Sequence, residues 1–172
     1  MMKRCLIAVA LVASVVLPAQ VDAGAAPAAA EHCVVHVTGQ EASGELIVST
    51  PRCYPTFAEA MSEEQVSAWG VGASERAGGS DVGALSFTLA THYDYTGFNP
   101  AGGTTSTVGT GCTGGWLNTS GAWNDRIGST RNGCPTVIHF DLTGLGGSSA
   151  ATTGTGGNLG TMNNRTSSIQ YT

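Results

Sequence analysis

The C-terminal half of the sequence repeats a unit of about 40 residues, and this repeat constrains the fold more than any other feature. Three segments of the first copy return in the same order in the second: residues 92–98 as 139–145, 114–117 as 156–159, and 124–129 as 163–168. The spacing between matching segments shortens along the chain, so the second copy is the first with shorter turns. The repeat predicts two equivalent supersecondary units that bury their faces against each other.

The N-terminus has the pattern of an export signal. Two basic residues precede an apolar run over residues 6–17, and a small-residue cleavage motif ends at Ala23. The run is shorter than the roughly 20 residues that cross a membrane. We therefore expect residues 1–23 to be a signal peptide, the mature protein to be secreted, and no membrane association after cleavage. Cleavage after Ala19 or Ala30 also fits the pattern.

Four cysteines follow the predicted signal peptide, and an even count in an exported chain predicts disulfides. Nearest-neighbour pairing, Cys33 with Cys53 and Cys112 with Cys134, keeps each bridge within one region. Each bridge would stabilise the fold by roughly 3 kcal/mol in the chain-entropy description. A metal site is the alternative, but the sequence has no Cys-x-x-Cys spacing.

Composition divides the mature chain into four parts. Residues 24–31 are rich in Ala, Gly and Pro and predict a flexible leader. Residues 32–71 predict a small disulfide-linked α+β region. Residues 72–83 are rich in Gly, Ser and Ala and predict a linker, after which residues 84–172 form the repeat domain. Because charge and cysteine pairing also change at the linker, we expect the repeat domain to fold without the region before it.

Local patterns predict the elements within these parts. Residues 33–37 and 45–49 indicate strands, and Thr56 with Glu59 forms a capping box that begins a helix of about ten residues. The repeat domain has no helical period, and its short β-branched and aromatic runs between turn residues predict an all-β sandwich. Its clearest strands are residues 85–89, 135–140 and 168–171.

Charge and motifs exclude several functions. Without the signal peptide the net charge is about −6, and the repeat domain has three aspartates against three arginines and no lysine. Nucleic acid and anionic lipid both select clustered positive charge, so neither is an expected partner. The sequence contains no nucleophile elbow, zinc-protease motif or phosphate loop. We therefore expect a protein that is not an enzyme.

The repeated aromatic segments resemble those of a known family. Residues 140–147 follow the pattern aromatic, four residues, aromatic, one residue, glycine, with Leu145 in the second aromatic position. Residues 93–98 supply both aromatics of the first copy, but proline replaces the glycine and Gly102 comes two residues late. This pattern resembles the Greek-key motif of the microbial βγ-crystallin family. The resemblance implies a βγ-crystallin-like double Greek-key sandwich.

The repeated polar segments resemble the calcium motif of the same family, Asx-Asx-x-x-Ser/Thr-Ser. Residues 163–168 match fully, and residues 124–129 match except for Gly128. In the family, the Asx end of one segment shares an ion with the Ser/Thr of the other. The resemblance therefore implies these calcium ligands: Asn124, Asp125, Asn163, Asn164 and Ser167, with Asp94 and Asp141 as candidates near the ion.

The residue types agree with this implication. Calcium takes about six to eight oxygen ligands, which carboxylates, amides, hydroxyls and carbonyls supply. Asp125 would pair with Ser167, whereas Asn164 would face Gly128 and lack a hydroxyl, so we expect the second site to be weak or empty. The alternative is that these residues only close Asx turns. His92 and His139 also stand at equivalent positions, and we favour exposed strand positions for them over a zinc site.

Three functions fit these observations. The first is a secreted, non-catalytic calcium-binding module. The second is a peptidase inhibitor acting on an extracellular protease, because residues 123–127 resemble secreted actinobacterial proteins grouped with small peptidase inhibitors; residues 99–111 are its candidate inhibitory loop. The third is an envelope or toxin-like interaction protein. The oligomeric state is open.

Overall fold

The computed structural model describes residues 30–68 and 86–172. The predicted signal peptide, the linker and most of the predicted leader lie outside the described residues. The described chain forms eleven strands in two sheets, one α-helix and four short 3-10 helices. The prediction that β-structure dominates is therefore confirmed.

The first sheet has the strand order β10-β7-β4-β5-β1-β2, and β3 also pairs with β1. Its strands are β1 (His32–Gln40), β2 (Leu46–Val48), β3 (Arg52–Tyr54), β4 (Phe87–Tyr93), β5 (Thr104–Gly109), β7 (Ser129–Asn132) and β10 (Gly157–Asn158). The second sheet has the order β6-β11-β8-β9. Its strands are β6 (Gly115–Asn118), β8 (Thr136–Leu142), β9 (Gly146–Thr153) and β11 (Ser168–Tyr171). The 3-10 helices are η1 (Thr96–Phe98), η2 (Pro100–Gly102), η3 (Gly121–Trp123) and η4 (Gly160–Met162).

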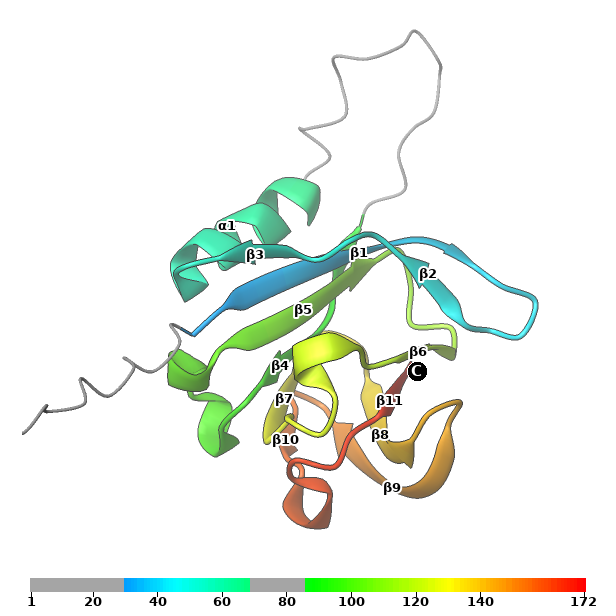
Figure 1. Ribbon diagram of the computed structural model, residues 1–172. Helices are drawn as coiled ribbons and strands as arrows, with labels where there is room; N and C mark the ends of the chain where they lie inside the picture. The colour runs from blue at the N-terminus through cyan, green and yellow to red at the C-terminus, as the bar shows by residue number, and fades with distance from the viewer. Residues whose placement is uncertain (1–29, 69–85) are drawn as a thin grey trace, which may run out of the picture.

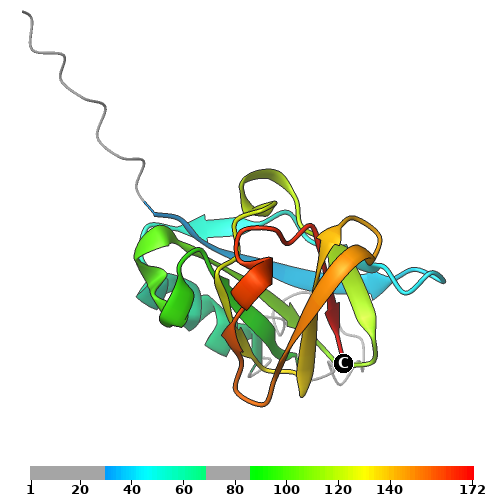
Figure 2. The same cartoon turned by 90° about the horizontal axis from the view of Figure 1, so that it is seen from below.

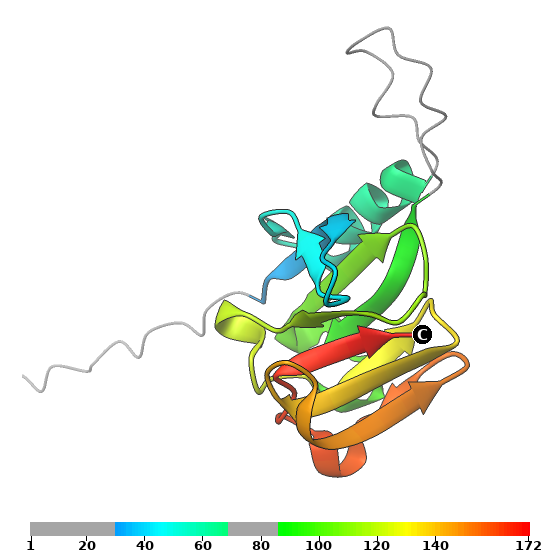
Figure 3. The same ribbon diagram turned by 90° about the vertical axis from the view of Figure 1, so that its right-hand side faces the viewer.

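These elements form three layers. Helix α1 (Phe57–Ala68) packs on one face of the first sheet, and the second sheet lies on its other face (Figures 1 and 3). The hairpin of β1 and β2 projects beyond the body of the molecule (Figure 2). The core between the sheets includes Leu89, Ile127, Val137 and Ile169, each at most 1% exposed.

The two copies of the repeat exchange strands. β4, β5 and β7 of the first copy share a sheet with β10 of the second, and β8, β9 and β11 share a sheet with β6 of the first. Asn118 pairs with Ser168, and Asn158 pairs with Ser129, so the strand registers make Asn118 and Asn158 equivalent. The sequence alignment of residues 114–117 with 156–159 is therefore wrong by two residues, because the turns before the strands differ in length.

The region before the predicted linker joins the first sheet directly. β1 pairs with β5 in parallel over five residues, from His32 opposite Thr104 to His36 opposite Val108. Val34 and Val108 form a second small core with Ala60 of α1. The predicted α+β elements are present, but this region and the repeat domain share one continuous sheet.

Helix α1 begins as its sequence predicts. The Thr56 backbone N–H donates to the Glu59 carboxylate at 3.2 Å, and the Glu59 N–H donates to the Thr56 hydroxyl at 3.3 Å. Both orphan donors of the first turn are thus satisfied.

The two predicted disulfides are present. Cys33–Cys53 joins β1 to β3, and Cys112–Cys134 closes the segment between β5 and β8 beside the main core. Two disulfides indicate an oxidising compartment.

Nearly half of the candidate inhibitory loop, residues 99–111, is a strand and not a protruding loop. Residues 104–109 form β5, which lies between β4 and β1 with five of its six residues buried. Gly and Thr content suggested a loop, but the hydroxyls of Thr104, Ser106 and Thr107 contact polar groups inside the fold. An example is the 3.1 Å bond from the Ser106 hydroxyl to that of Thr91.

Candidate functional site

The tips of two hairpins, β4–β5 and β8–β9, are closed by identical contacts. The Ser129 hydroxyl donates to the Tyr95 carbonyl at 2.6 Å and accepts the Phe98 N–H at 3.0 Å. The Ser168 hydroxyl makes the same pair of contacts, at 2.6 and 3.0 Å, with the tip of the second copy. Within each copy, the last residue of the Asx segment therefore lies against the tip of that copy's own hairpin.

Two amides complete these closures across the copies. Asn158 accepts the Gly97 N–H at 2.7 Å, and Asn118 accepts the Gly144 N–H at 2.8 Å. Each amide belongs to the other copy from the tip it holds. Sequence comparison missed this pair because its alignment was two residues out of register.

The two Asx segments run against each other. Asp125 and Asn164 both have a φ of 55°, in the left-handed region that Asp and Asn tolerate best among non-glycine residues. The Asp125 N–H donates to the Thr166 carbonyl, and the Asn164 N–H donates to the Ile127 carbonyl, each at 3.0 Å. These two backbone hydrogen bonds pair the Asx segments with each other.

The first Asx pair meets the hydroxyl of the other segment. Asp125 Oδ1 accepts a hydrogen bond from the Ser167 hydroxyl at 3.3 Å, and Oδ2 accepts one from the Asn124 amide at 2.8 Å. Asp125 is exposed, whereas Ser167 is buried. The structure thus brings together three of the predicted ligands.

The second Asx pair faces a crowded glycine. A Cβ atom on Gly128 would lie 2.5 Å from the Asp94 carbonyl oxygen and 2.9 Å from Asn163 Oδ1. Asn163 and Asn164 are both exposed, and this pair contains no carboxylate. The absence of a side chain at Gly128 is therefore a packing requirement of the tip beside it.

The other two predicted carboxylates are held by arginines. Asp94 lies 3.1 Å from Arg126 Nη2, and Asp141 lies 2.7 Å from Arg165 Nη2. Arg126 also donates to the Gly102 carbonyl at 2.7 Å. These aspartates bind the Asx segments to the hairpins through guanidinium groups, so an ion at Asp125 would not have them as free ligands.

The two repeated histidines are buried, and the predicted exposed positions are wrong. His92 and His139 are at most 1% exposed, and their rings meet edge to face with centroids 5.4 Å apart. Thr130 lies 2.9 Å from His92 Nδ1 and 3.1 Å from His139 Nε2. Tyr171 lies 3.3 Å from His92 Nε2. A chain of polar contacts therefore links the two sheets.

Burial determines the protonation state of the two histidines and of Tyr171. Burial lowers the pKa of His139 from 6.5 to about 3. Burial, and secondarily the neighbouring His139, lowers the pKa of His92 well below its usual value. Burial raises the pKa of Tyr171, so all three rings are neutral at pH 7. Two histidines alone supply too few ligands for a zinc site, which usually has at least three from Cys, His, Asp or Glu.

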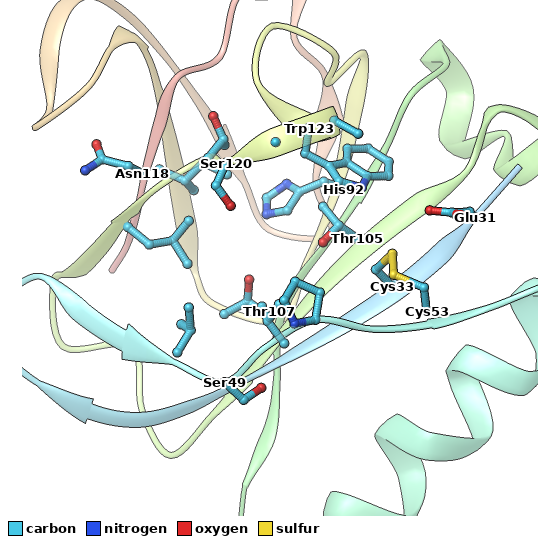
Figure 4. Close-up of a pocket in the computed structure, with 18 of the residues that line it drawn as sticks. Glu31, Cys33, Ser49, Cys53, His92, Thr105, Thr107, Asn118, Ser120 and Trp123 are labelled. Atoms are coloured by element: carbon cyan, nitrogen blue, oxygen red, sulfur yellow. A yellow bond between two sulfur atoms is a disulfide. The ribbon is translucent and has the colours of Figure 1, made fainter.

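A cavity of about 340 Å³ lies beside His92 and Tyr171 (Figure 4). It is enclosed by β1 and β5, by the β2–β3 segment, and by the segment that follows β6. Glu31, Cys33 and Cys53 also meet there, but both sulfurs belong to the disulfide, so this group does not supply thiolate ligands to a metal.

No protein-family model matches the chain, and comparison with curated proteins and with solved structures gave no match either. Among the described residues, no helix has the length and apolarity needed to cross a membrane.

Proposed function

We propose that the protein is a secreted, non-catalytic module that binds a calcium ion between its two Asx segments, on a βγ-crystallin-type double Greek-key scaffold. The strand order supports the scaffold: within each copy the fourth strand lies beside the first, β7 beside β4 and β11 beside β8. This is the neighbour relation of a Greek key. The exchanged third strands, β6 and β10, then lock the copies together.

One observation carries the ion site. The carboxylate of Asp125 and the hydroxyl of Ser167 come from different copies and lie 3.3 Å apart. Two oxygens at this separation can both lie within the 2.3–2.6 Å that Ca²⁺ requires. The ion would replace the hydrogen bond between Ser167 and Asp125 and would bridge the two copies by binding both oxygens.

The composition of the site limits its affinity. Asp125 is the one carboxylate in either Asx pair, and Arg126 and Arg165 neutralise the two nearest other aspartates. With so little charge we expect a dissociation constant of roughly 10⁻⁴–10⁻³ M, typical of extracellular modules. At calcium tenfold above that constant, stabilisation is about 1.4 kcal/mol, or a few degrees in melting temperature.

Titration calorimetry and thermal melts of the mature protein, in EDTA and in 10 mM calcium, test the proposal. Wild type should melt a few degrees higher in calcium and show one binding event. Asp125→Asn keeps the shape of the side chain and should abolish both effects. Asn164→Gly, at the equivalent position of the other copy, tolerates the positive φ and is the control, which should leave both intact.

The competing explanation is that Asp125 and Ser167 only close turns. It would be correct if wild type melts at the same temperature in EDTA and in calcium and gives no heat of binding. A protease panel then becomes the next experiment, because the inhibitor alternative does not depend on calcium.

A further inference from the structure

The cavity beside the histidines is independent of the calcium proposal. It has a deep polar side formed by His92, Thr107 and Tyr171, each at most 3% exposed. Tyr171 lies 2.9 Å from the Thr107 hydroxyl and 3.3 Å from His92, so these groups bond to one another. These three residues line the cavity, but their polar atoms are already hydrogen-bonded to one another.

The walls are mainly apolar. Val35 and Val48 come from β1 and β2, Leu117 from β6, and Trp123 from η3. Apolar walls around a few polar groups are typical of small-molecule sites, and the volume of about 340 Å³ lies at the lower end of their range of about 300–1,000 Å³.

Two hydroxyl groups remain for a ligand. Those of Thr105 and Ser120 make no hydrogen bond to other described residues, and both line the cavity (Figure 4). Thr105 lies on β5, whereas Ser120 lies on the segment across the opening. A bound molecule could therefore gain hydrogen bonds on both sides.

The charge of the lining selects the ligand. Glu31 is the one charged residue among the described residues that line the cavity, and its carboxylate lies within 4.8 Å of the Cys33 and Cys53 sulfurs. No basic side chain within the described residues forms an ion pair with it. An anion would meet no positive partner in this lining, whereas an ammonium group would meet a carboxylate.

We propose that this cavity binds a small apolar amine, with its ammonium group at Glu31 and its apolar part between Leu117, Val35 and Trp123. The occupant is small because the cavity has room for about one aromatic ring and a short chain. The exposed carboxylate contributes modestly, so apolar burial supplies most of the affinity.

The test uses phenethylamine and 3-phenylpropionate, which share a phenyl ring and differ in charge. Each is titrated to 20 mM into the ¹⁵N-labelled mature protein in EDTA, which keeps the result independent of calcium. Phenethylamine should shift the amide resonances of Thr105, Leu117 and Ala122 saturably, and 3-phenylpropionate should bind at least tenfold more weakly. Glu31→Gln should weaken phenethylamine by about threefold to fivefold.

Thr105→Phe should fill the cavity and abolish binding, and Thr153→Phe on the exposed edge strand β9 is its matched control. Should Thr105→Phe fail to fold, Ser120→Trp blocks the opening from an exposed position. The proposal is overturned if phenethylamine shifts none of the cavity resonances, if the anion binds as tightly, or if the blocking variant binds like wild type.

Discussion

Acidification should destabilise the protein through its buried histidine pair. The pKa of His139 falls from 6.5 in the unfolded chain to about 3 in the fold. Because the folded value is depressed, the unfolded state binds protons first as pH falls below 6.5, and stability is lost from there down to about pH 3. Above pH 6.5 the histidine is neutral in both states and no stability is lost.

The size of the loss follows from the pKa difference. A pH of 4.5 is two units below the pKa of the unfolded histidine, while the folded one is still neutral, so His139 alone removes about 3 kcal/mol. His92 acts in the same direction. A domain of this size typically has about 5–15 kcal/mol in total, so the loss is a large fraction of it.

Urea unfolding at pH 7.5, 6.0 and 4.5 measures this effect. His139→Gln can keep hydrogen bonds to Thr130 and Thr166 but does not titrate, so it should lose about 3 kcal/mol less than wild type between pH 7.5 and 4.5. Ser148→Ala, at an exposed residue that does not titrate, is the control and should follow wild type.

Two results would refute the reasoning. One is a loss below 1 kcal/mol in wild type between pH 7.5 and 4.5. The other is a His139→Gln protein with unchanged pH dependence. If that variant does not fold, the imidazole resonances of wild type decide, because His139 must not titrate between pH 7 and 5.

Three further changes test the packing of the repeat. Ser168→Ala leaves two backbone groups of the hairpin tip unpaired, so it should lower the free energy of unfolding in urea by roughly 1–3 kcal/mol. Ser148→Ala, at an exposed serine, is the control and should change it by less than about 0.5 kcal/mol. Gly128→Ser should lower the melting temperature without adding a calcium event, since its Cβ would press on the Asp94 carbonyl; a second heat of binding would contradict this. A fragment of residues 84–172 should melt cooperatively but at a lower temperature than the mature chain, because β5 loses its partner β1; a non-cooperative melt would show that the region before the linker is required.

Local chemistry was readable from the sequence. The strand over residues 168–171 and the capping box at Thr56 were predicted as they occur, because alternation and capping depend on near neighbours. The disulfide partners were also predicted, since each lies within about 20 residues in a region that folds on itself.

Contacts between residues far apart in the chain could not be predicted from the sequence. Nothing in the pattern of residues 32–40 indicates that the strand pairs in parallel with β5, across more than 60 residues. The burial of His92 and His139 was missed because strands β4 and β8 mix polar with apolar residues, which resembles an exposed strand. Their environment depends on Thr130 from a third strand, and the cavity combines segments from both halves of the chain.

For the candidate ion site, the sequence identified the residues and the structure added their constraints. Asp125 and Ser167 were paired through the family resemblance, and their side chains do meet. The arginine partners of Asp94 and Asp141 were not foreseen, because arginine on a polar turn is usually solvated. Only the fold shows that these carboxylates are already neutralised.

The exchange of β6 and β10 also bears on how such a chain could arise. A single copy of the repeat, alone in solution, would have one strand directed away from its own sheet and an unfilled edge where the partner's strand belongs. The piece that fits that edge is the same strand of a second identical copy. A single repeat would therefore complete both edges only as a symmetric homodimer, and the two linked copies keep the strand pairings that such a dimer would have.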